Sequence, residues 1–162
     1  MPDVKTLYEE DFVAWSKEQA EALRAAARGR TNRPIDWENV AEEIESLGIS
    51  QRSELKSQIR RVIEHLLKLE HSRALDPRQG WVESITDARN EIERVLEDSP
   101  SLKSEVAASI VMETRRGARK AIKALEAFGE AGRDTAVRIQ IQAASYAEEQ
   151  ILGDWFPPEP AP

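Results

Sequence analysis

The chain has 162 residues, no cysteine and a net charge of −7. Its length is typical of one domain with a core of its own, and the lack of cysteine excludes disulfides, thiolate metal sites and a cysteine nucleophile. The negative charge argues against general binding of nucleic acid, because phosphate contacts need positive charge. No stretch approaches the roughly 18 apolar residues of a membrane span, and the acidic start lacks the apolar run of a signal peptide. We therefore expect a cytoplasmic protein that does not enter a membrane.

The first half of the chain predicts three helices after a frayed start at residues 1–7. The first, over residues 11–27, ends at Gly29, and its uncharged stripe consists of Phe12, Trp15, Gln19, Ala22, Leu23 and Ala26. Asp36 is suited to capping the second helix, whose apolar face consists of Trp37, Val40, Ile44 and Leu47. Gly48 stands where a glycine commonly ends a helix. A third helix is then expected from Ser50 to about Arg73, with its stripe at Leu55, Ile59, Val62, Leu66 and Leu69.

The second half predicts a fourth helix over residues 81–96 and a long fifth helix over 100–128. Gly117 lies inside the fifth helix and indicates a bend or a close contact with another helix. The region 129–144 is ambiguous because RIQIQ alternates like a strand but has no second strand to pair with; a helix or irregular turn is preferred. A short helix over 145–152 follows. The Pro-rich tail 157–162 is expected to be disordered.

These elements predict an all-α fold. We expect an antiparallel-leaning helical bundle of four to five core helices plus a short C-terminal helix, in one domain over residues 1–156.

Several blocks of sequence also resemble the bacterial family called domain of unknown function 29. They are LYEEDFVAW, DWENVAEEIESLG, HLLKLEH, the pair Trp81 and Ile85, LEDSPSL and EEQILGDWFP, in this order along nearly the whole chain. The resemblance implies an all-helical fold and a bacterial source, and it implies no activity. The family tends to have a proline in the loop before its last helix, whereas this chain has RDTAVRIQIQAAS there.

One candidate site lies on the polar edge of the predicted third helix. His65 is expected to be a half-buried residue at the rim of the core, hydrogen-bonded to a neighbour. Alternatively, Glu43 reaches inward from the second helix and pairs with His65, with Arg61 beside them, in a small-molecule or metal site. The Glu-x-x-His motif of di-iron bundles is absent, so no metal or cofactor is predicted.

A second candidate is the basic face of the predicted fifth helix, which consists of Arg116, Arg119, Lys120 and Lys123. Such a face can bind phosphate, which makes weak nucleic-acid binding one alternative. The acidic stripe Glu38, Glu42 and Glu45 on the second helix is its counterpart. The two stripes are either solvated or meet each other, within one molecule or across a dimer.

No sequence pattern supports a hydrolase triad or a nucleotide phosphate loop. The preferred hypothesis is a non-enzymatic protein-interaction or self-association module, with a second copy of the chain or another protein as partner.

Overall fold

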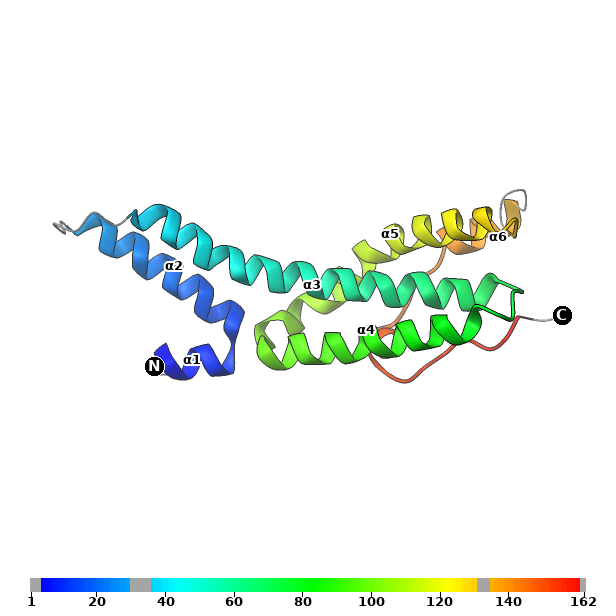
Figure 1. Ribbon diagram of the computed structural model, residues 1–162, viewed down its shortest axis with the longest axis horizontal. Helices are drawn as coiled ribbons and strands as arrows, with labels where there is room; N and C mark the ends of the chain where they lie inside the picture. The colour runs from blue at the N-terminus through cyan, green and yellow to red at the C-terminus, as the bar shows by residue number, and fades with distance from the viewer. Residues whose placement is uncertain (1–3, 30–35, 131–134, 161–162) are drawn as a thin grey trace. The chain divides into compact units, whose positions relative to one another are not determined.

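The computed structural model describes residues 4–29, 36–130 and 135–160. In chain order the helices are α1 (Val4–Glu10), α2 (Phe12–Arg28), α3 (Trp37–His71), α4 (Arg78–Asp98), the 3-10 helix η1 (Pro100–Glu105), α5 (Val106–Ala127), α6 (Thr135–Gln142) and α7 (Glu148–Leu152) (Figure 1). The described residues contain no strand, so the all-α prediction is confirmed. Among these helices, none is both long and apolar enough to cross a membrane.

The chain forms two compact units. The first unit consists of Met1–Glu54 and Arg94–Ser104, and the second of Leu55–Glu93 and Glu105–Pro162. The single domain expected over residues 1–156 stays a prediction. Pro157, the first residue of the predicted tail, is buried.

In the first unit, Asp11 joins two elements that are distant in sequence. Its carboxylate caps α2 by accepting from the Ala14 amide at 2.8 Å, as a side chain at this position does for an otherwise unpartnered amide. It also accepts from the Ser101 amide at 2.6 Å and the Ser101 hydroxyl at 3.0 Å. One residue therefore fixes both the start of α2 and the position of η1. Of the start predicted to be frayed, residues 4–7 belong to α1, and residues 1–3 lie outside the described residues.

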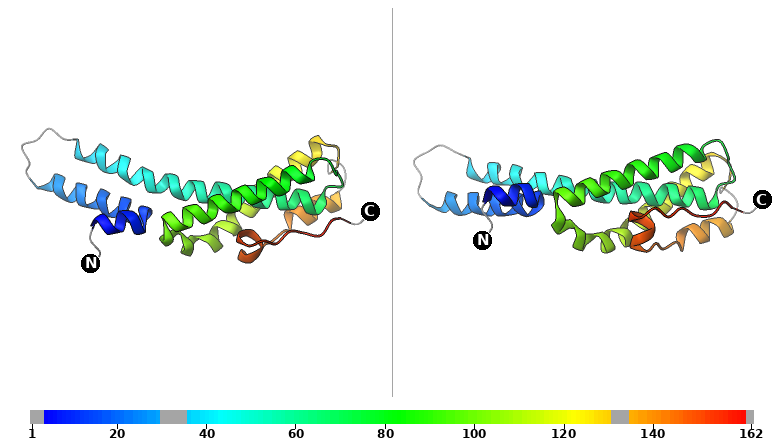
Figure 2. Two further views of the ribbon diagram at one scale, coloured as in Figure 1. Left: turned by 60° about the horizontal axis from the view of Figure 1, so that its bottom comes forward. Right: turned by 90° about the horizontal axis from the view of Figure 1, so that it is seen from below.

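The predicted break at Gly48 is wrong, because α3 is one helix of 35 residues. A glycine ends a helix by adopting a positive φ, and Gly48 does not have one. Instead, a Cβ atom at Gly48 would collide with the side chain of Ser16 in α2. The glycine thus allows α2 and α3 to approach closely, and α2 runs beside the first part of α3 in both views of Figure 2.

In the second unit, α3, α4 and α5 bury their apolar stripes. The fully buried large side chains include Leu55, Ile59, Ile63, Leu66, Ile85, Ile92 and Leu125. Gly117 of α5 allows a close contact with α3. Of the two alternatives predicted for it, a bend or a close helix contact, the structure supports the contact. A Cβ atom there would lie 2.9 Å from Cγ2 of Ile63 in α3.

One prediction about the second half needs correction: the predicted fifth helix begins as a 3-10 helix and becomes α-helical only at Val106. The preferred helix for RIQIQ is confirmed, since residues 135–142 form α6 beside α5 (Figure 1), and the strand alternative is thereby excluded.

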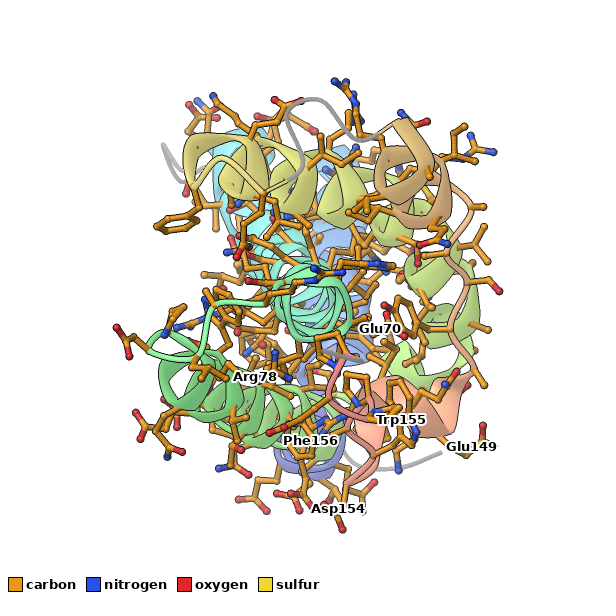
Figure 3. All side chains as sticks on the ribbon, turned by 90° about the vertical axis from the view of Figure 1, so that its right-hand side faces the viewer. Glu70, Arg78, Glu149, Asp154, Trp155 and Phe156 are labelled. Carbon is orange, nitrogen blue, oxygen red and sulfur yellow. The ribbon has the colours of Figure 1, made fainter. Side chains whose placement is uncertain are left out.

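Arg89 of α4 holds the C-terminal segment in place. Its buried guanidinium donates to the carbonyl oxygens of Gln150 at 2.8 Å, Ile151 at 3.0 Å and Trp155 at 2.6 Å. The Cζ atom of Arg89 also lies 4.8 Å from the centre of the Phe156 ring. Trp155 and Phe156 are labelled in Figure 3. The carbonyls of Gln150 and Ile151 belong to the last turn of α7, where carbonyl groups have no hydrogen-bond partner within the helix. Arg89 therefore acts as a C-terminal cap that another helix supplies.

Candidate functional site

The first surface of interest is the antiparallel hairpin of α2 and α3 in the first unit. Arg24 of α2 pairs with Glu38 at 3.1 Å and with Glu45 at 2.8 Å, and Ser16 lies against Gly48. Two of the three glutamates in the predicted acidic stripe therefore meet a cation of the same unit.

The apolar stripe predicted for α2 is not the face that α2 buries. The buried residues are Val13, Ser16 and Ala20, whereas Ala22 and Ala26 of the predicted stripe are exposed. Tyr8 of α1 partly covers the end of the stripe at Trp15, and the centres of the two rings lie 4.8 Å apart. On α3, Val40 is 40% exposed and Leu47 is 46% exposed.

The two stripes lie on the same side of the hairpin. They are exposed at Ala22, Ala26, Val40 and Leu47 and half-buried at Trp15, Gln19, Leu23 and Ile44. In each helix, a stripe residue comes one position before a residue that contacts the other helix. On α2 these pairs are Trp15–Ser16 and Leu23–Arg24, and on α3 they are Ile44–Glu45 and Leu47–Gly48. One position is a rotation of about 100°. Because the helices are antiparallel, the same rotation in each turns both stripes to one side. We call this surface the hairpin face: Trp15, Gln19, Ala22, Leu23, Ala26, Val40, Ile44 and Leu47.

The structure does not bring Glu43 and His65 together. Both belong to the continuous helix α3, 22 positions apart, and a rise of about 1.5 Å per residue separates them by about 33 Å. Glu43 is exposed, and Arg61 is exposed as well. Across the described part of the chain, no group of three or more His, Cys, Asp or Glu residues could hold a metal ion.

His65 is half-buried, as predicted, but its Nδ1 atom has no hydrogen-bond partner. Burial lowers its pKa from 6.5 to about 4, and the charge of Lys68 acts in the same direction. At neutral pH the imidazole is therefore uncharged, and it is a residue of the rim of the core.

The predicted basic face of α5 divides into two edges. At one edge, Arg116 and Lys120 face α3 and meet carboxylates. Glu113, which is fully buried, accepts from Arg116 at 2.9 Å and lies 3.6 Å from Arg60 of α3. Glu64 of α3 pairs with Lys68 at 2.7 Å and lies 3.8 Å from Lys120. We call these residues of α3 and α5 the α3–α5 seam, and two of the four predicted basic residues stabilise it.

At the other edge, Arg119 lies four positions after Arg115. Both line a cavity between α5 and Gln142 at the end of α6, and Arg115 also lines a second cavity that reaches residues 144–146. Lys123, the fourth predicted basic residue, is exposed and lines neither cavity. Sequence reasoning missed Arg115 because it lies at the border of the apolar stripe. Its spacing of four from Arg119 would have placed it on the same edge.

The family model described as "Domain of unknown function DUF29" matches residues 7–156. The chain belongs to this family. The family predicted from the sequence blocks is thereby confirmed, and the blocks DWENVAEEIESLG and EEQILGDWFP correspond to α3 of the hairpin and to the segment that Arg89 holds.

A similar solved structure is the crystal structure of an alpha-helical protein of unknown function from Rhodospirillum rubrum ATCC 11170. It is 26% identical to this DUF29 chain, with a TM-score of 0.74, and the match covers 93% of this chain and 91% of that one. No curated protein matches the chain. The likeness extends over both units and agrees with the all-α fold.

Proposed function

We propose that this protein is a self-association module in which two copies pair through their hairpin faces. The observation that carries the proposal is the exposure of Val40 and Leu47 on the same side as the uncharged stripe of α2. Two antiparallel helices with their apolar stripes on one side make half of a four-helix bundle. A second hairpin laid on that side would complete it.

A second copy is a suitable partner because the hairpin face is complementary to itself. The contacts between Ser16 and Gly48 and between Arg24 and Glu45 place Ala22 and Ala26 of α2 level with Ile44 and Val40 of α3. A two-fold axis parallel to the helices would set α2 of one copy against α3 of the other. Small alanines would then face larger branched side chains, as packing of facing helices requires. A non-enzymatic role in the cytoplasm is part of this proposal, and the lack of cysteine agrees with that compartment.

Sedimentation equilibrium of the full chain tests the proposal. We expect the wild type to form dimers, and Val40→Lys with Leu47→Lys to weaken them. Each buried side chain contributes roughly 1.5–3 kcal/mol, so the dimer dissociation constant should rise about 100-fold or more. Ile49→Lys is the matched control. Ile49 is 56% exposed on the same helix, about half a turn away from Val40, so its replacement should leave the dimer unchanged.

Two results would overturn the proposal. One is a wild type that remains monomeric at the highest concentration at which it is soluble. The other is a dimer that Ile49→Lys weakens as much as the double variant does, which would place the interface on another face of α3. Far-UV circular dichroism of all variants checks that the helices are retained.

A further inference from the structure

The second unit carries a cationic groove, whereas the hairpin face belongs to the first unit. Two adjoining cavities of about 190 and 380 Å³ run along α5, and both are lined by Arg115 and Gln142. Arg119 lines the larger cavity. Ile110, Val111 and Ser145 line the smaller one. We call these two cavities the α5 groove.

The charge of the α5 groove is positive and unbalanced. Neither Arg115 nor Arg119 pairs with any of the described residues, and the residues that line the two cavities include no carboxylate. Tyr146 also lines the smaller cavity, but its hydroxyl donates to Glu70 at 2.7 Å and is already used. Two guanidinium groups, a glutamine amide and a serine hydroxyl are left as donors. This set of donors selects an anion.

The spacing of the two arginines favours a phosphate group over a carboxylate. Side chains four positions apart on a helix have their Cβ atoms about 5–6 Å apart, so both guanidinium groups can reach one ligand. A carboxylate has two oxygens, which a single guanidinium fork can satisfy. The dianion of a phosphate monoester has three terminal oxygens and two charges, which match two guanidinium groups. We infer that the α5 groove binds a small phosphate monoester, with its organic part against Ile110 and Val111.

A nucleic acid fits these observations less well. Binding along a strand requires several phosphate contacts, yet Arg116 and Lys120 on the same helix are used by the α3–α5 seam. The groove therefore offers two cations at one place, which suits a single phosphate group.

Calorimetric titration with phenyl phosphate tests the inference on the full chain. We expect saturable 1:1 binding, with no binding of phenol, because the phosphate group carries the recognition. Arg115→Gln and Arg119→Gln should each weaken binding about tenfold or more, as loss of a charged hydrogen-bond donor does. Lys123→Gln is the matched control: Lys123 is exposed on α5 and lines neither cavity, so its replacement removes a screened charge but no donor of the groove, and it should weaken binding less than either arginine variant does.

A titration that shows no saturable binding at millimolar phenyl phosphate would overturn the inference. A Lys123→Gln variant that binds as weakly as the arginine variants would also do so, because the effect would then be general charge. A single-stranded oligonucleotide that binds more tightly than phenyl phosphate, with the same dependence on Arg115 and Arg119, would replace the small ligand by a nucleic acid. Amide chemical shifts of the wild type give a readout free of substitutions. Phenyl phosphate should perturb residues 114–119 and 142–146, and changes confined to other residues would contradict the site.

Discussion

Replacing Arg89 by lysine should release the C-terminal segment while the rest of the fold stays intact. Arg89 donates to three carbonyl oxygens of this segment and lies over the Phe156 ring. Lysine keeps the charge but lacks the planar fork, so it can retain about one of the three hydrogen bonds. A hydrogen bond to a charged group contributes about 1.5–3 kcal/mol after exchange with water, so the loss of two of them is about 3–6 kcal/mol. The lower end of this range, about 3 kcal/mol, applies because the hydrogen bonds to Gln150 and Trp155 are only part-buried.

Hydrogen exchange followed by mass spectrometry measures this loss directly. A decrease of about 3 kcal/mol in the opening free energy raises the exchange rate about 100-fold. We expect that increase in residues 148–156 of Arg89→Lys and no change in residues 12–28. Arg94→Lys is the control, since Arg94 belongs to the same helix and its pair with Asp98 is exposed. An increase below about threefold in the segment, or a uniform increase in the whole chain, would refute the role assigned to Arg89.

Three further substitutions have defined outcomes. Gly117→Ala should lower the free energy of unfolding by about 1 kcal/mol in urea denaturation, because overpacking against Ile63 exceeds the gain in helix propensity; Gly80→Ala, with open space at its Cβ, should be neutral or stabilising. Folding lowers the pKa of His65 to about 4, so the unfolded chain binds more protons than the folded chain between about pH 4 and 6.5. The free energy of unfolding should therefore fall as the pH decreases through this range. His65→Gln should reduce that fall, measured as the urea midpoint at each pH. Glu113→Gln should destabilise by about 1–3 kcal/mol in thermal melts, since it leaves two arginines without a carboxylate partner.

The helices themselves could be predicted because their apolar spacing is local information. The stripe at Leu55, Ile59, Val62, Leu66 and Leu69 is buried, as its period indicates. The role of Gly48 could not be predicted in the same way. Whether a glycine ends a helix or allows a close contact depends on what lies opposite, and the side chain opposite Gly48 is Ser16, 32 positions earlier.

The basic residues of α5 also show that contacts between distant parts of the chain cannot be read from local spacing. Helical spacing correctly places Arg116, Arg119, Lys120 and Lys123 on α5, but it does not reveal which of them meet carboxylates. Glu113 is three positions before Arg116 and was accessible to sequence reasoning. Glu64 belongs to α3, so its proximity to Lys120 is a property of the packed helices.

The net charge of −7 does not contradict an anion site on this chain. Exposed charges interact appreciably only within a Debye length, about 8 Å at physiological ionic strength. The carboxylate of Glu70, which contacts Tyr146 of the groove, accepts from the Tyr146 hydroxyl. Arg115 and Arg119 are the charged residues that line the groove, while distant carboxylates are screened. A long polyanion extends beyond this region and would meet the negative remainder of the surface. The affinity for phenyl phosphate should therefore decrease with salt, since the screened attraction of two exposed guanidinium groups carries the binding.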